Sequence, residues 1–413
     1  MWGNCRYFFS CWIWACTPLK NKSLNKSLKI IIIIAYMVTQ KSINIKNKKN
    51  IILTGGGTGG SVSPLLAIFD ELAGGDYNFY WVGTKNGIEQ EMVRREGIDF
   101  FSINSGKFRR YFSWKNFIDP FFVILGFFDS LLIIKKCNPD LVISAGGFVS
   151  VPFVWAARAR RIPIIIHQQD ARPGLANKLM CRCAKVITTV FKKSLEDFCK
   201  KPVWIGNPVR REFINLQKSR TRQESLKKFN LKDNKPVIFI TGGGTGSVFL
   251  NMLVVTSLQE LTKNFQILHA TGKGREAESP LEWKYDLHRE DYRKFEFLNT
   301  TQMMDAYNAA DIVVSRCGMG ALTELSFLKK VCILIPMPRT HQEDNARMFM
   351  DNEAAIVLNQ KYLDSNKFIQ SIKNLMENKH KQQKLRENIG KIIKQNASAE
   401  MVKIINKLIT HNS

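Results

Sequence analysis

The chain has 413 residues, 45% of them hydrophobic, which is enough for two domains of ordinary size with substantial cores. Its 61 Lys and Arg residues against 35 Asp and Glu give a formal net charge of +26, which favours an anionic partner, although a Lys-, Asn- and Ile-rich genome can account for part of it. No nucleic-acid-binding motif accompanies this charge, and the nine cysteines form no C-x-x-C pair, so we expect no nucleic-acid partner and no zinc or redox site.

Residues 1–49 differ in composition from the rest and are expected to form an N-terminal extension outside the fold. Residues 1–17 are crowded with aromatic residues and Cys, and residues 18–50 are rich in Lys and Asn around the isoleucine run 30–34. That run is shorter than the ~20 apolar residues that a membrane-spanning helix needs, which leaves a short interfacial anchor as the alternative. A reading frame whose true start is Met37 would also explain the extension.

Short apolar runs alternate with helical stretches from residue 50 onward, which predicts βαβ units and a parallel sheet. The strands expected in the first half are residues 51–53, 79–82, 141–144 and 164–166. A helix is expected over 64–72, directly after the first strand. These elements indicate an N-terminal Rossmann-like domain over 50–207.

The same pattern restarts at Val237. The strands expected in the second half are residues 237–240, 267–269, 312–314 and 331–335. A helix is expected over 250–261. The fold class is therefore α/β, with a second Rossmann-like domain over 208–385 and a helical tail over 386–413.

Two almost identical glycine loops each follow the first strand of one half. The first glycine loop is Thr54–Gly60, and the second glycine loop is Thr241–Ser247. Glycines at a strand-to-helix turn let the backbone approach a phosphate closely, and the helix that follows offers free N–H donors. The repeat favours two phosphate-binding turns over the alternative of two tight turns with no ligand.

The first glycine loop also satisfies G-x-G-x-x-G, which raises a dinucleotide-binding dehydrogenase as an alternative. That fold places an acidic residue at the end of the second strand to bind the ribose. Here the second strand ends in Val82-Gly83-Thr84, and Asp76 precedes the strand. A nicotinamide cofactor is therefore not expected.

A third glycine-containing turn lies at Ser315–Leu325, after a strand and at the start of a helix. Its small residues suit a phosphate-accepting turn, and Glu324 is expected about one turn into the helix, where a carboxylate can accept hydrogen bonds from two ribose hydroxyls. A solvated helix residue or a partner of the helix dipole is the alternative for Glu324. The polar segment His341–Ala346 is expected to line the same site.

Together these motifs resemble the MurG family of glycosyltransferases over roughly residues 50–400. The motifs that agree with the family in order and spacing are Gly56–Gly60, Gly146–Pro152, His167–Asp170 with Gly174 and Asn177, Gly206–Arg210, the second glycine loop with Asn251, Ser315–Glu324 and His341–Ala346. The resemblance implies a GT-B fold, in which two Rossmann-like domains face a cleft and the C-terminal one holds most of the UDP-sugar. It implies inverting transfer of N-acetylglucosamine from UDP-GlcNAc to a polyprenyl-pyrophosphate-linked acceptor, lipid I, giving lipid II in peptidoglycan synthesis.

The resemblance also implies donor contacts residue by residue. Glu324 would hold the ribose, Leu298 the uracil through its backbone, and Gln342 the sugar hydroxyls. Arg210 and the N–H groups at helix N-termini are expected to stabilise the departing diphosphate. The full set of implied donor contacts is Thr58, Gly59, Gly60, Asp170, Arg210, Gly244, Leu298, Met319, Gly320, Ala321, Leu322, Thr323, Glu324 and Gln342. Since no D-x-D triplet is present, no metal or other cofactor is expected.

Several positions depart from the family pattern. Ser61 stands where the family usually has His, and Gly244-Thr245 stand where it has Ser-Gln. The family's H-E-Q-N reads His167-Gln168-Gln169-Asp170 here. His167 and Asp170 are the candidates for the general base that deprotonates the acceptor hydroxyl, and the ordinary pKa of a histidine favours His167. A hydrogen-bonded structural histidine is the alternative for His167.

Aromatic and aliphatic residues flanked by Lys and Arg gather in residues 108–136, followed by Arg158, Arg160 and Arg161. This composition suits a helix lying on an anionic membrane surface, and a core helix of the N-terminal domain is the alternative. The expected location is peripheral, on the cytoplasmic face of the cell membrane. A transferase for another glycolipid acceptor and a catalytically impaired UDP-sugar-binding module are the alternative functions.

Overall fold

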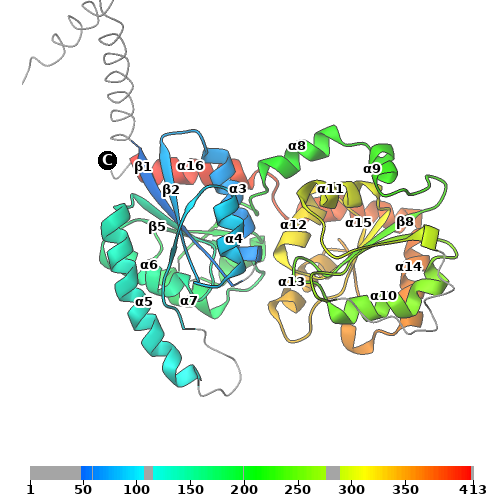
Figure 1. Ribbon diagram of the computed structural model, residues 1–413, viewed down its shortest axis with the longest axis horizontal. Helices are drawn as coiled ribbons and strands as arrows, with labels where there is room; N and C mark the ends of the chain where they lie inside the picture. Colours follow the sequence, from blue (N-terminus) through cyan, green and yellow to red (C-terminus); the bar gives the residue numbers. More distant parts are fainter. Residues whose placement is uncertain (1–47, 58, 107–114, 199, 276–288, 411–413) are drawn as a thin grey trace, which may run out of the picture. The chain divides into compact units, whose positions relative to one another are not determined.

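The computed structural model describes residues 48–410 with gaps at 58, 107–114, 199 and 276–288 (Figure 1). All but the last two residues of the expected extension over 1–49 lie outside the described residues, and so does Met37. Residues Lys49–Ser413 form one compact unit. This unit holds two α/β domains, each built on one parallel sheet.

The N-terminal domain contains a seven-stranded parallel sheet in the order β3-β2-β1-β4-β5-β6-β7. Its strands are β1 (Lys49–Thr54), β2 (Tyr77–Gly83), β3 (Asp99–Ser102), β4 (Leu141–Ser144), β5 (Ile164–Gln168), β6 (Val186–Thr189) and β7 (Val203–Trp204). Its helices are α3 (Gly59–Leu72), α4 (Ile88–Arg95), α5 (Lys115–Cys137), α6 (Ser150–Ala159) and α7 (Leu175–Met180).

Helices cover both faces of this sheet, which explains the unbroken apolar runs of its strands. In β1, Ile51 and Leu53 pack in one cluster with residues of α3, whereas Ile52 between them packs in a second cluster with residues of α6. The expected helix over 64–72 begins earlier, at Gly59. The last two glycines of the first glycine loop therefore form the first turn of α3.

The C-terminal domain contains a six-stranded parallel sheet in the order β10-β9-β8-β11-β12-β13. Its strands are β8 (Val237–Thr241), β9 (Gln266–Ala270), β10 (Tyr292–Phe295), β11 (Ile312–Ser315), β12 (Cys332–Leu334) and β13 (Ile356–Val357). The helices from the interdomain segment onward are α8 (Arg211–Ser219), α9 (Arg222–Lys228), α10 (Val248–Leu261), α11 (Thr300–Ala309), α12 (Met319–Phe327), α13 (His341–Asp351), α14 (Ser365–Glu377), α15 (Lys379–Ile392) and α16 (Ala397–Thr410).

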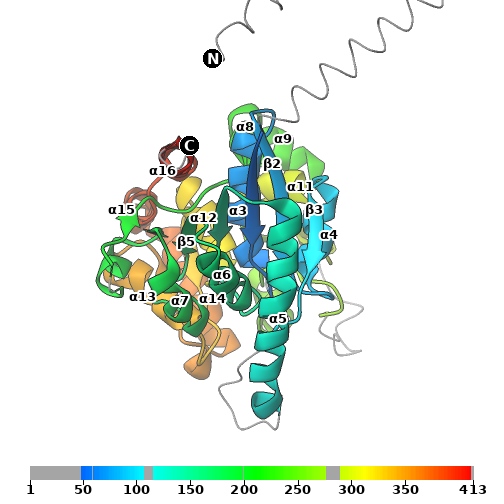
Figure 2. The same ribbon diagram turned by 90° about the vertical axis from the view of Figure 1, so that its left-hand side faces the viewer.

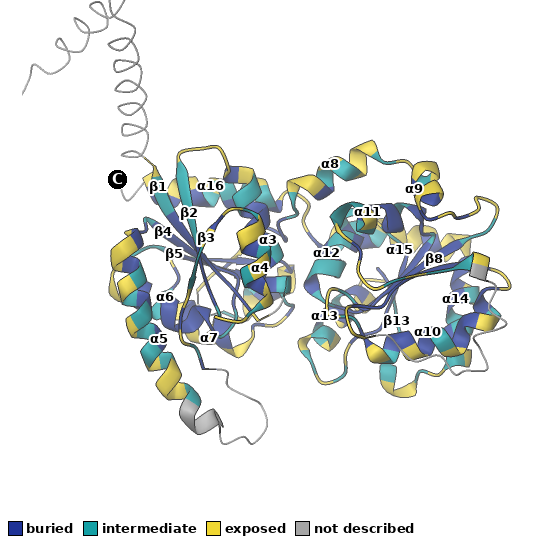
Figure 3. Ribbon diagram, in the orientation of Figure 1, coloured by how far each residue is buried: buried dark blue, intermediate teal, exposed yellow. Residues whose placement is uncertain are grey.

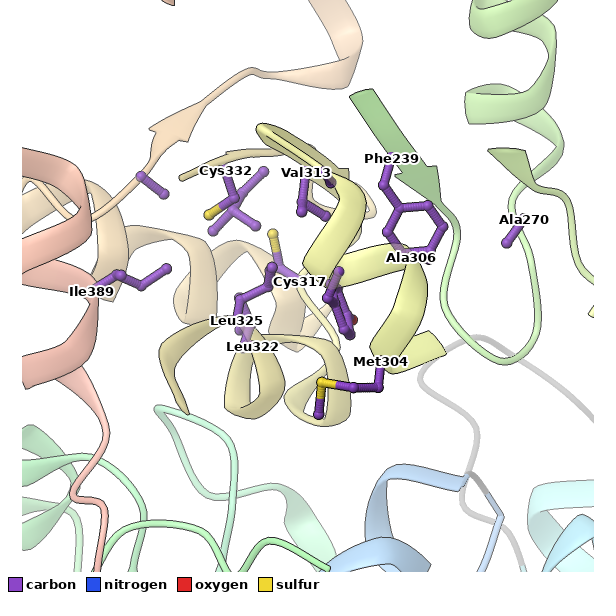
Figure 4. Close-up of a cluster of buried hydrophobic side chains, with 14 of the residues drawn as sticks. Phe239, Ala270, Met304, Ala306, Val313, Cys317, Leu322, Leu325, Cys332 and Ile389 are labelled. Carbon is purple, nitrogen blue, oxygen red and sulfur yellow. The ribbon is translucent and has the colours of Figure 1, made fainter. Parts of the chain in front are cut away.

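One core cluster of the C-terminal domain holds α12, the helix that carries most of the predicted donor segment, Ser315–Leu325. Leu322 and Leu325 of α12 are buried against sheet residues such as Phe239 and Val313, and Ile389 of α15 lies in the same cluster (Figure 4). The apolar side of α12 is therefore held in the core, and the start of the helix keeps a fixed place at the carboxyl end of β11.

The C-terminal helices differ from the expected tail over 386–413. The boundary expected at residue 386 falls inside α15, which packs on α12 and belongs to the C-terminal domain. The last helix, α16, instead packs on α3 of the N-terminal domain through Met401 and Ile405. Tyr77 of β2 also donates a hydrogen bond to Asn406 at 2.8 Å. The apolar stripe of α16 explains this return, because only burial against another element removes it from water.

The aromatic segment of the N-terminal domain forms α5, which packs along α6 (Figures 1 and 2). Exposed positions recur along α5, as Figure 3 shows, and several of them carry large apolar side chains. These side chains are Phe121, Phe122, Ile124, Phe128 and Leu132. The alternative of a core helix holds for the opposite face, where Ile134 and Cys137 belong to a core cluster of the N-terminal domain. In the described part of the chain, no helix combines the length and the apolar character that crossing a membrane requires.

Candidate active site

The second glycine loop leaves β8 and enters α10 with its outer side open. Gly243 and Gly246 have positive φ angles of 77° and 68°, which L side chains rarely adopt. A Cβ atom built at Gly243 or Gly244 would meet nothing within 4 Å, whereas one at Gly242 would lie 2.5 Å from the Ser247 nitrogen. The loop thus folds tightly against α10 on one side and leaves room for a ligand at Gly243 and Gly244 on the other.

The start of α12 offers unpaired donors next to open space. Gly318 is the N-cap of the helix, and no side chain caps the first turn. The N–H groups at the start of a helix have no partner within it, and the helix dipole adds partial positive charge there. A Cβ atom at Gly318 or Gly320 would meet nothing within 4 Å. The predicted donor residues Met319, Gly320 and Ala321 therefore lie where an anion can reach the backbone.

Glu324 is the sixth residue of α12, and its carboxyl group is partly occupied by a partner within the protein. Its Oε2 atom accepts a hydrogen bond from the Tyr307 hydroxyl at 2.8 Å, and its side chain is half-buried. Burial raises the pKa of Glu324 to about 7, and the bond from Tyr307 opposes that rise. Tyr307 was not expected from the sequence, because a buried tyrosine in a helix gives no local sign of a polar partner. One carboxylate oxygen, Oε1, has no partner among the described residues.

Gln342 and Leu298 present polar groups in different ways. The Gln342 Oε1 atom accepts from the backbone nitrogens of Cys317 at 3.2 Å and Met337 at 3.1 Å, which turns the amide nitrogen away from both. Among the described residues nothing accepts a bond from that nitrogen, so it remains a donor for a ligand. The Leu298 side chain is buried in the core just before α11, which leaves its backbone as the part that can recognise a base.

The first glycine loop has a different backing from the second. Glu89 of α4 is fully buried, and its carboxyl group accepts from the Thr84 nitrogen at 2.9 Å, the Thr84 hydroxyl at 2.5 Å and the Gly57 nitrogen at 3.4 Å. A Cβ atom at Gly56 would lie 2.5 Å from Glu89 Oε1, so a side chain there would displace the Glu89 carboxyl group. Gly59 and Gly60 follow in the first turn of α3, and Thr58 lies outside the described residues.

The sequence pattern does not reveal Glu89, because a dinucleotide-binding fold places its ribose-binding acid at the end of the second strand. Glu89 lies in the first turn of α4 and reaches back to Thr84, which directly follows β2. Its carboxyl oxygens are occupied by main-chain and hydroxyl donors of the protein. This arrangement differs from that of a ribose-binding acid, and the absence of a nicotinamide cofactor stays a prediction.

His167 does not have the environment of a general base. It is fully buried on β5, with Nδ1 2.9 Å from the Thr188 hydroxyl and Nε2 2.9 Å from Asn207 Oδ1. Burial lowers the pKa of His167 to about 4, although the bond with Asn207 opposes that shift. The histidine therefore stays neutral at neutral pH.

The neighbours of His167 also fix which nitrogen carries the proton. Thr323 of α12 donates its hydroxyl to Met319 O at 2.6 Å, so it accepts from Asn207 Nδ2 at 2.8 Å. Asn207 then presents its oxygen to His167, which must donate from Nε2 and accept the Thr188 hydroxyl at Nδ1. With its lone pair occupied, His167 cannot take a proton from an acceptor. The expectation of a catalytic His167 is corrected to a structural role that links β5 to α12.

Asp170 remains accessible beside the donor segment. Its side chain is 33% exposed, with Oδ1 3.9 Å from Nε2 of His341. Asn345 of α13 donates to Asp170 Oδ1 at 3.0 Å and to Cys317 O at 3.2 Å, and its own oxygen accepts from Ala171 N at 2.8 Å. Asn345 thus places Asp170 next to the residues that lead into α12, which the sequence alone did not show.

Gln168, a departure from the family pattern, shapes the loop that carries Asp170. Its amide nitrogen donates to the carbonyls of Asp170 at 2.8 Å and Arg172 at 3.1 Å, and its oxygen accepts from Asn177 at 2.6 Å. A glutamate in the same pose has no proton to give those two carbonyls. Gln168 therefore suits this loop as a positioning residue.

Arg210 lies elsewhere than expected. It is the N-cap of α8, and its guanidinium binds the carboxylates of Asp70 at 3.0 Å and Glu96 at 2.9 Å, both in the N-terminal domain. Two carboxylates satisfy a single positive charge, so this side chain is committed to an ion-pair network. The expectation that Arg210 stabilises the diphosphate is not met in this arrangement.

A metal site was not expected, and the structure adds no candidate for one. Within residues 48–410 and outside the gaps given above, no group of three or more His, Cys, Asp or Glu side chains could hold a metal ion. The absence of a metal from the reaction stays a prediction.

Comparisons with known proteins match both domains in chain order. Residues 51–189 match the glycosyltransferase family 28 N-terminal domain, and residues 237–404 match the glycosyltransferase family 28 C-terminal domain. A UDP-N-acetylglucosamine–N-acetylmuramyl-(pentapeptide) pyrophosphoryl-undecaprenol N-acetylglucosamine transferase of Clostridium botulinum (strain 657 / Type Ba4) is 40% identical over 337 residues, covering 80% of this chain and 92% of the relative. The protein of the same name from Clostridium tetani is 38% identical over 340 residues, covering 81% and 92%.

Solved structures share the fold. The crystal structure of Acinetobacter baumannii MurG matches with a TM-score of 0.66 at 24% identity, covering 87% of this chain and 99% of that chain. UDP-GlcNAc 2-epimerase from Neisseria meningitidis bound to UDP-GlcNAc matches with a TM-score of 0.64 at 14% identity, covering 87% and 100%. At these identities the likeness shows the fold alone, and it confirms the expected GT-B class.

The relatives are similar along nearly their whole length, so the match is not confined to one shared domain. The two family 28 domains occupy the same two halves that the sheets define. The chain belongs to glycosyltransferase family 28 and, within it, to the MurG family of UDP-N-acetylglucosamine–N-acetylmuramyl-(pentapeptide) pyrophosphoryl-undecaprenol N-acetylglucosamine transferases.

Proposed function

We propose that this chain transfers N-acetylglucosamine from UDP-GlcNAc to undecaprenyl-pyrophosphoryl-MurNAc-pentapeptide, a polyprenyl-pyrophosphate-linked acceptor. The relatives that are 38–40% identical carry this activity in their names. The observation that supports it best is the uncapped start of α12, with open space at Gly318 and Gly320 and the carboxyl group of Glu324 on the same helix. These are the donors and the acceptor that a nucleoside diphosphate requires.

In this proposal the C-terminal domain binds the donor. Backbone N–H groups of Gly244 and of the first turn of α12, Met319 to Ala321, bind the diphosphate, and the rest of the segment through Leu322, Thr323 and Glu324 lines it. Glu324 accepts from the ribose, and the free amide nitrogen of Gln342 donates to a sugar hydroxyl. The backbone of Leu298 pairs with the uracil. In this proposal Gly59 and Gly60 of the first glycine loop contact only the sugar of the donor, because Glu89 already accepts a bond from the neighbouring Gly57 nitrogen.

The chemistry requires one proton transfer and one leaving group. The acceptor hydroxyl oxygen bonds to C1 of N-acetylglucosamine as the bond from C1 to the diphosphate oxygen breaks, and attack from the opposite face inverts the anomeric centre. The hydroxyl proton passes to Asp170, the accessible carboxylate beside the donor segment. UDP leaves with the bonding electron pair, and fixed N–H donors stabilise its developing charge without a metal.

The exposed face of α5 supports a contact with an anionic membrane surface. Phe121, Phe128 and Leu132 are exposed on it. Exposed basic side chains lie at the C-terminal end of α5 and at and just after the end of α6, namely Lys135, Lys136, Arg158, Arg160 and Arg161. Apolar side chains beside Lys and Arg suit the interface of an anionic bilayer. A peripheral position on the cytoplasmic face would bring the lipid-linked acceptor to the N-terminal domain.

A turnover assay combined with calorimetry tests the proposal. The full chain is incubated with radiolabelled UDP-GlcNAc and a lipid I analogue, and label in the lipid fraction is measured while UDP binding is titrated separately. We expect both binding and transfer. Transfer only to a different glycolipid would identify another acceptor, and binding without transfer to several lipid acceptors would identify a binding module. A failure to bind UDP at all would contradict the whole assignment.

A further inference from the structure

A buried arginine lies directly behind the second glycine loop. Arg316 follows β11, two residues before the N-cap of α12, and its side chain is only 5% exposed. Its Nη1 atom donates to the carbonyls of Ile335 at 3.0 Å and Pro336 at 3.3 Å and to Gln360 Oε1 at 2.8 Å. Its Nε and Nη2 atoms donate to the Ser247 hydroxyl at 3.0 and 2.7 Å. Every acceptor of this guanidinium is neutral.

The charge of Arg316 has no counter-ion inside the described protein. No ion pair joins it to a carboxylate among the described residues, and its guanidinium carbon lies 5.7 Å from the centre of the Phe249 ring. Burial lowers the pKa of Arg316. A buried charge is costly unless it is paired, so this arrangement favours binding of an anion close by.

The hydrogen bonds of Ser247 show where that anion can be. Its hydroxyl oxygen accepts two bonds from Arg316 and a third from the Leu250 nitrogen at 3.3 Å, as the N-cap of α10. A hydroxyl has two lone pairs and one proton, so these donors share the two lone pairs, and the proton points away from them. The described residues supply no acceptor for it. The proton is therefore available to a ligand at the second glycine loop.

We propose that Arg316 and Ser247 together form a charge-assisted donor for the diphosphate of the sugar nucleotide. Ser247 donates its hydroxyl proton to a phosphate oxygen, and Arg316 is a positioning residue that orients the hydroxyl and supplies the positive charge. This inference rests on the proposed function, because it presupposes a nucleoside diphosphate as the donor. It places the cation of the site at Arg316, whereas the guanidinium of Arg210 is occupied by Asp70 and Glu96.

Binding of UDP and of uridine to single and double variants tests this pair. Ser247→Ala and Arg316→Lys should each weaken UDP binding by about tenfold to a hundredfold, since a hydrogen bond to a charged group is lost. Uridine lacks the diphosphate, so its affinity for each variant, measured by competition with UDP-GlcNAc, should equal its affinity for the wild type. The UDP affinity of the double variant should lie within about twofold of that of the weaker-binding single variant. The two effects should not add, because Arg316 acts through Ser247.

Matched controls lie on the same helix and in the same domain. Ser257→Ala removes another buried hydroxyl of α10, and Arg222→Lys alters an arginine that is paired with Asp311 at 3.1 Å. Both should leave UDP affinity within about twofold of the wild type. Thermal melting identifies any variant that fails to fold, and if Arg316→Lys fails, Ser247→Ala decides alone.

Two results would overturn the pair while leaving the proposed function intact. One is UDP affinity that is unchanged in Ser247→Ala, and the other is an equal loss of UDP and uridine affinity, which would indicate a general packing defect. A wild-type chain that binds no UDP is a different outcome, because it removes the proposed function itself.

Discussion

The two glycine loops are nearly identical in sequence but have opposite charges behind them. Behind the first lies the buried carboxyl group of Glu89, which accepts a bond from the Gly57 nitrogen at 3.4 Å. Behind the second lies the buried guanidinium of Arg316, which holds the Ser247 hydroxyl at 2.7 Å. The same glycine pattern therefore serves two different sites.

The difference shows what a glycine loop does and does not specify. The glycines let a ligand come close to the backbone, and the helix that follows supplies N–H donors. The sign of the charge behind the loop then decides whether a diphosphate is attracted. A carboxyl group that already occupies loop N–H groups disfavours a dianion, whereas an unpaired guanidinium favours it. This difference is why we propose the second glycine loop as the diphosphate site.

The largest effect is expected at Asp170, which belongs to neither loop. Asp170→Asn removes the accessible base but keeps an oxygen for Asn345, so it should lower kcat by about 10²–10⁴-fold. The affinity for UDP should change by less than about threefold, because the second glycine loop and α12 are untouched. Steady-state transfer and calorimetry measure the two quantities. A fully active variant would show that the base lies elsewhere.

The next largest effect is expected at Glu324, which lies with Arg316 in the C-terminal domain. Glu324→Ala should weaken UDP-GlcNAc binding by about tenfold to a hundredfold, because a charge-assisted bond to the ribose is lost. It should also reduce discrimination against 2′-deoxy-UDP. Titration calorimetry with both nucleotides provides the measurement. Wild-type affinity in this variant would mean that the donor site is misplaced.

The raised pKa of Glu324 predicts a pH dependence of donor binding. Its carboxyl group is protonated below about pH 7, and the ionised form accepts more hydroxyl bonds, so UDP affinity should rise from pH 6 to 8 by at most about tenfold. By the same linkage, ionising this group makes the unliganded fold less stable as the pH rises from 4.5 to about 7. Glu324→Gln is the control, because it retains the titration of the nucleotide's own phosphate. An identical slope in that variant would remove Glu324 as the cause.

The smallest effect on binding is expected at the first glycine loop. Glu89→Gln keeps an oxygen for Thr84 but turns an amide toward the Gly57 N–H, so it should lower the free energy of unfolding by about 1–3 kcal/mol. UDP affinity should stay within about twofold of the wild type. Denaturant melts and calorimetry on the same sample separate the two effects. A large loss of UDP affinity without loss of stability would break the contrast between the loops.

The sequence predicted the α/β class, the two domains and the place of each glycine loop, because these depend on local apolar runs and glycine turns. The central strands and the start of α12 follow such patterns directly. The end of the C-terminal domain was misplaced, since α15 and α16 have similar amphipathic sequences but pack on different domains. Periodicity shows that a helix has an apolar face and does not show what covers it.

The side-chain chemistry was harder to predict, because it depends on partners far apart in the chain. His167 has the right residue type for a base, yet Thr188 and Asn207 occupy both of its ring nitrogens. Arg210 follows a family motif, yet Asp70, 140 positions away in the chain, binds its guanidinium. No local pattern contains these partners. The proposals of Asp170 as the base and Arg316 as the cation therefore depend on burial and hydrogen-bond geometry, which no local sequence pattern contains.

Hydrogen–deuterium exchange with and without saturating UDP tests the contrast between the two loops most directly. Exchange is followed by mass spectrometry in peptides that cover residues 54–61, 242–251 and 315–325, so both loops and the start of α12 are read in one experiment. We predict that UDP slows amide exchange in residues 242–251 and 315–325, because the diphosphate binds backbone N–H groups of the second glycine loop and α12. The exchange rates in residues 54–61 should not change. Protection centred on 54–61, with none in 242–251, would contradict this prediction.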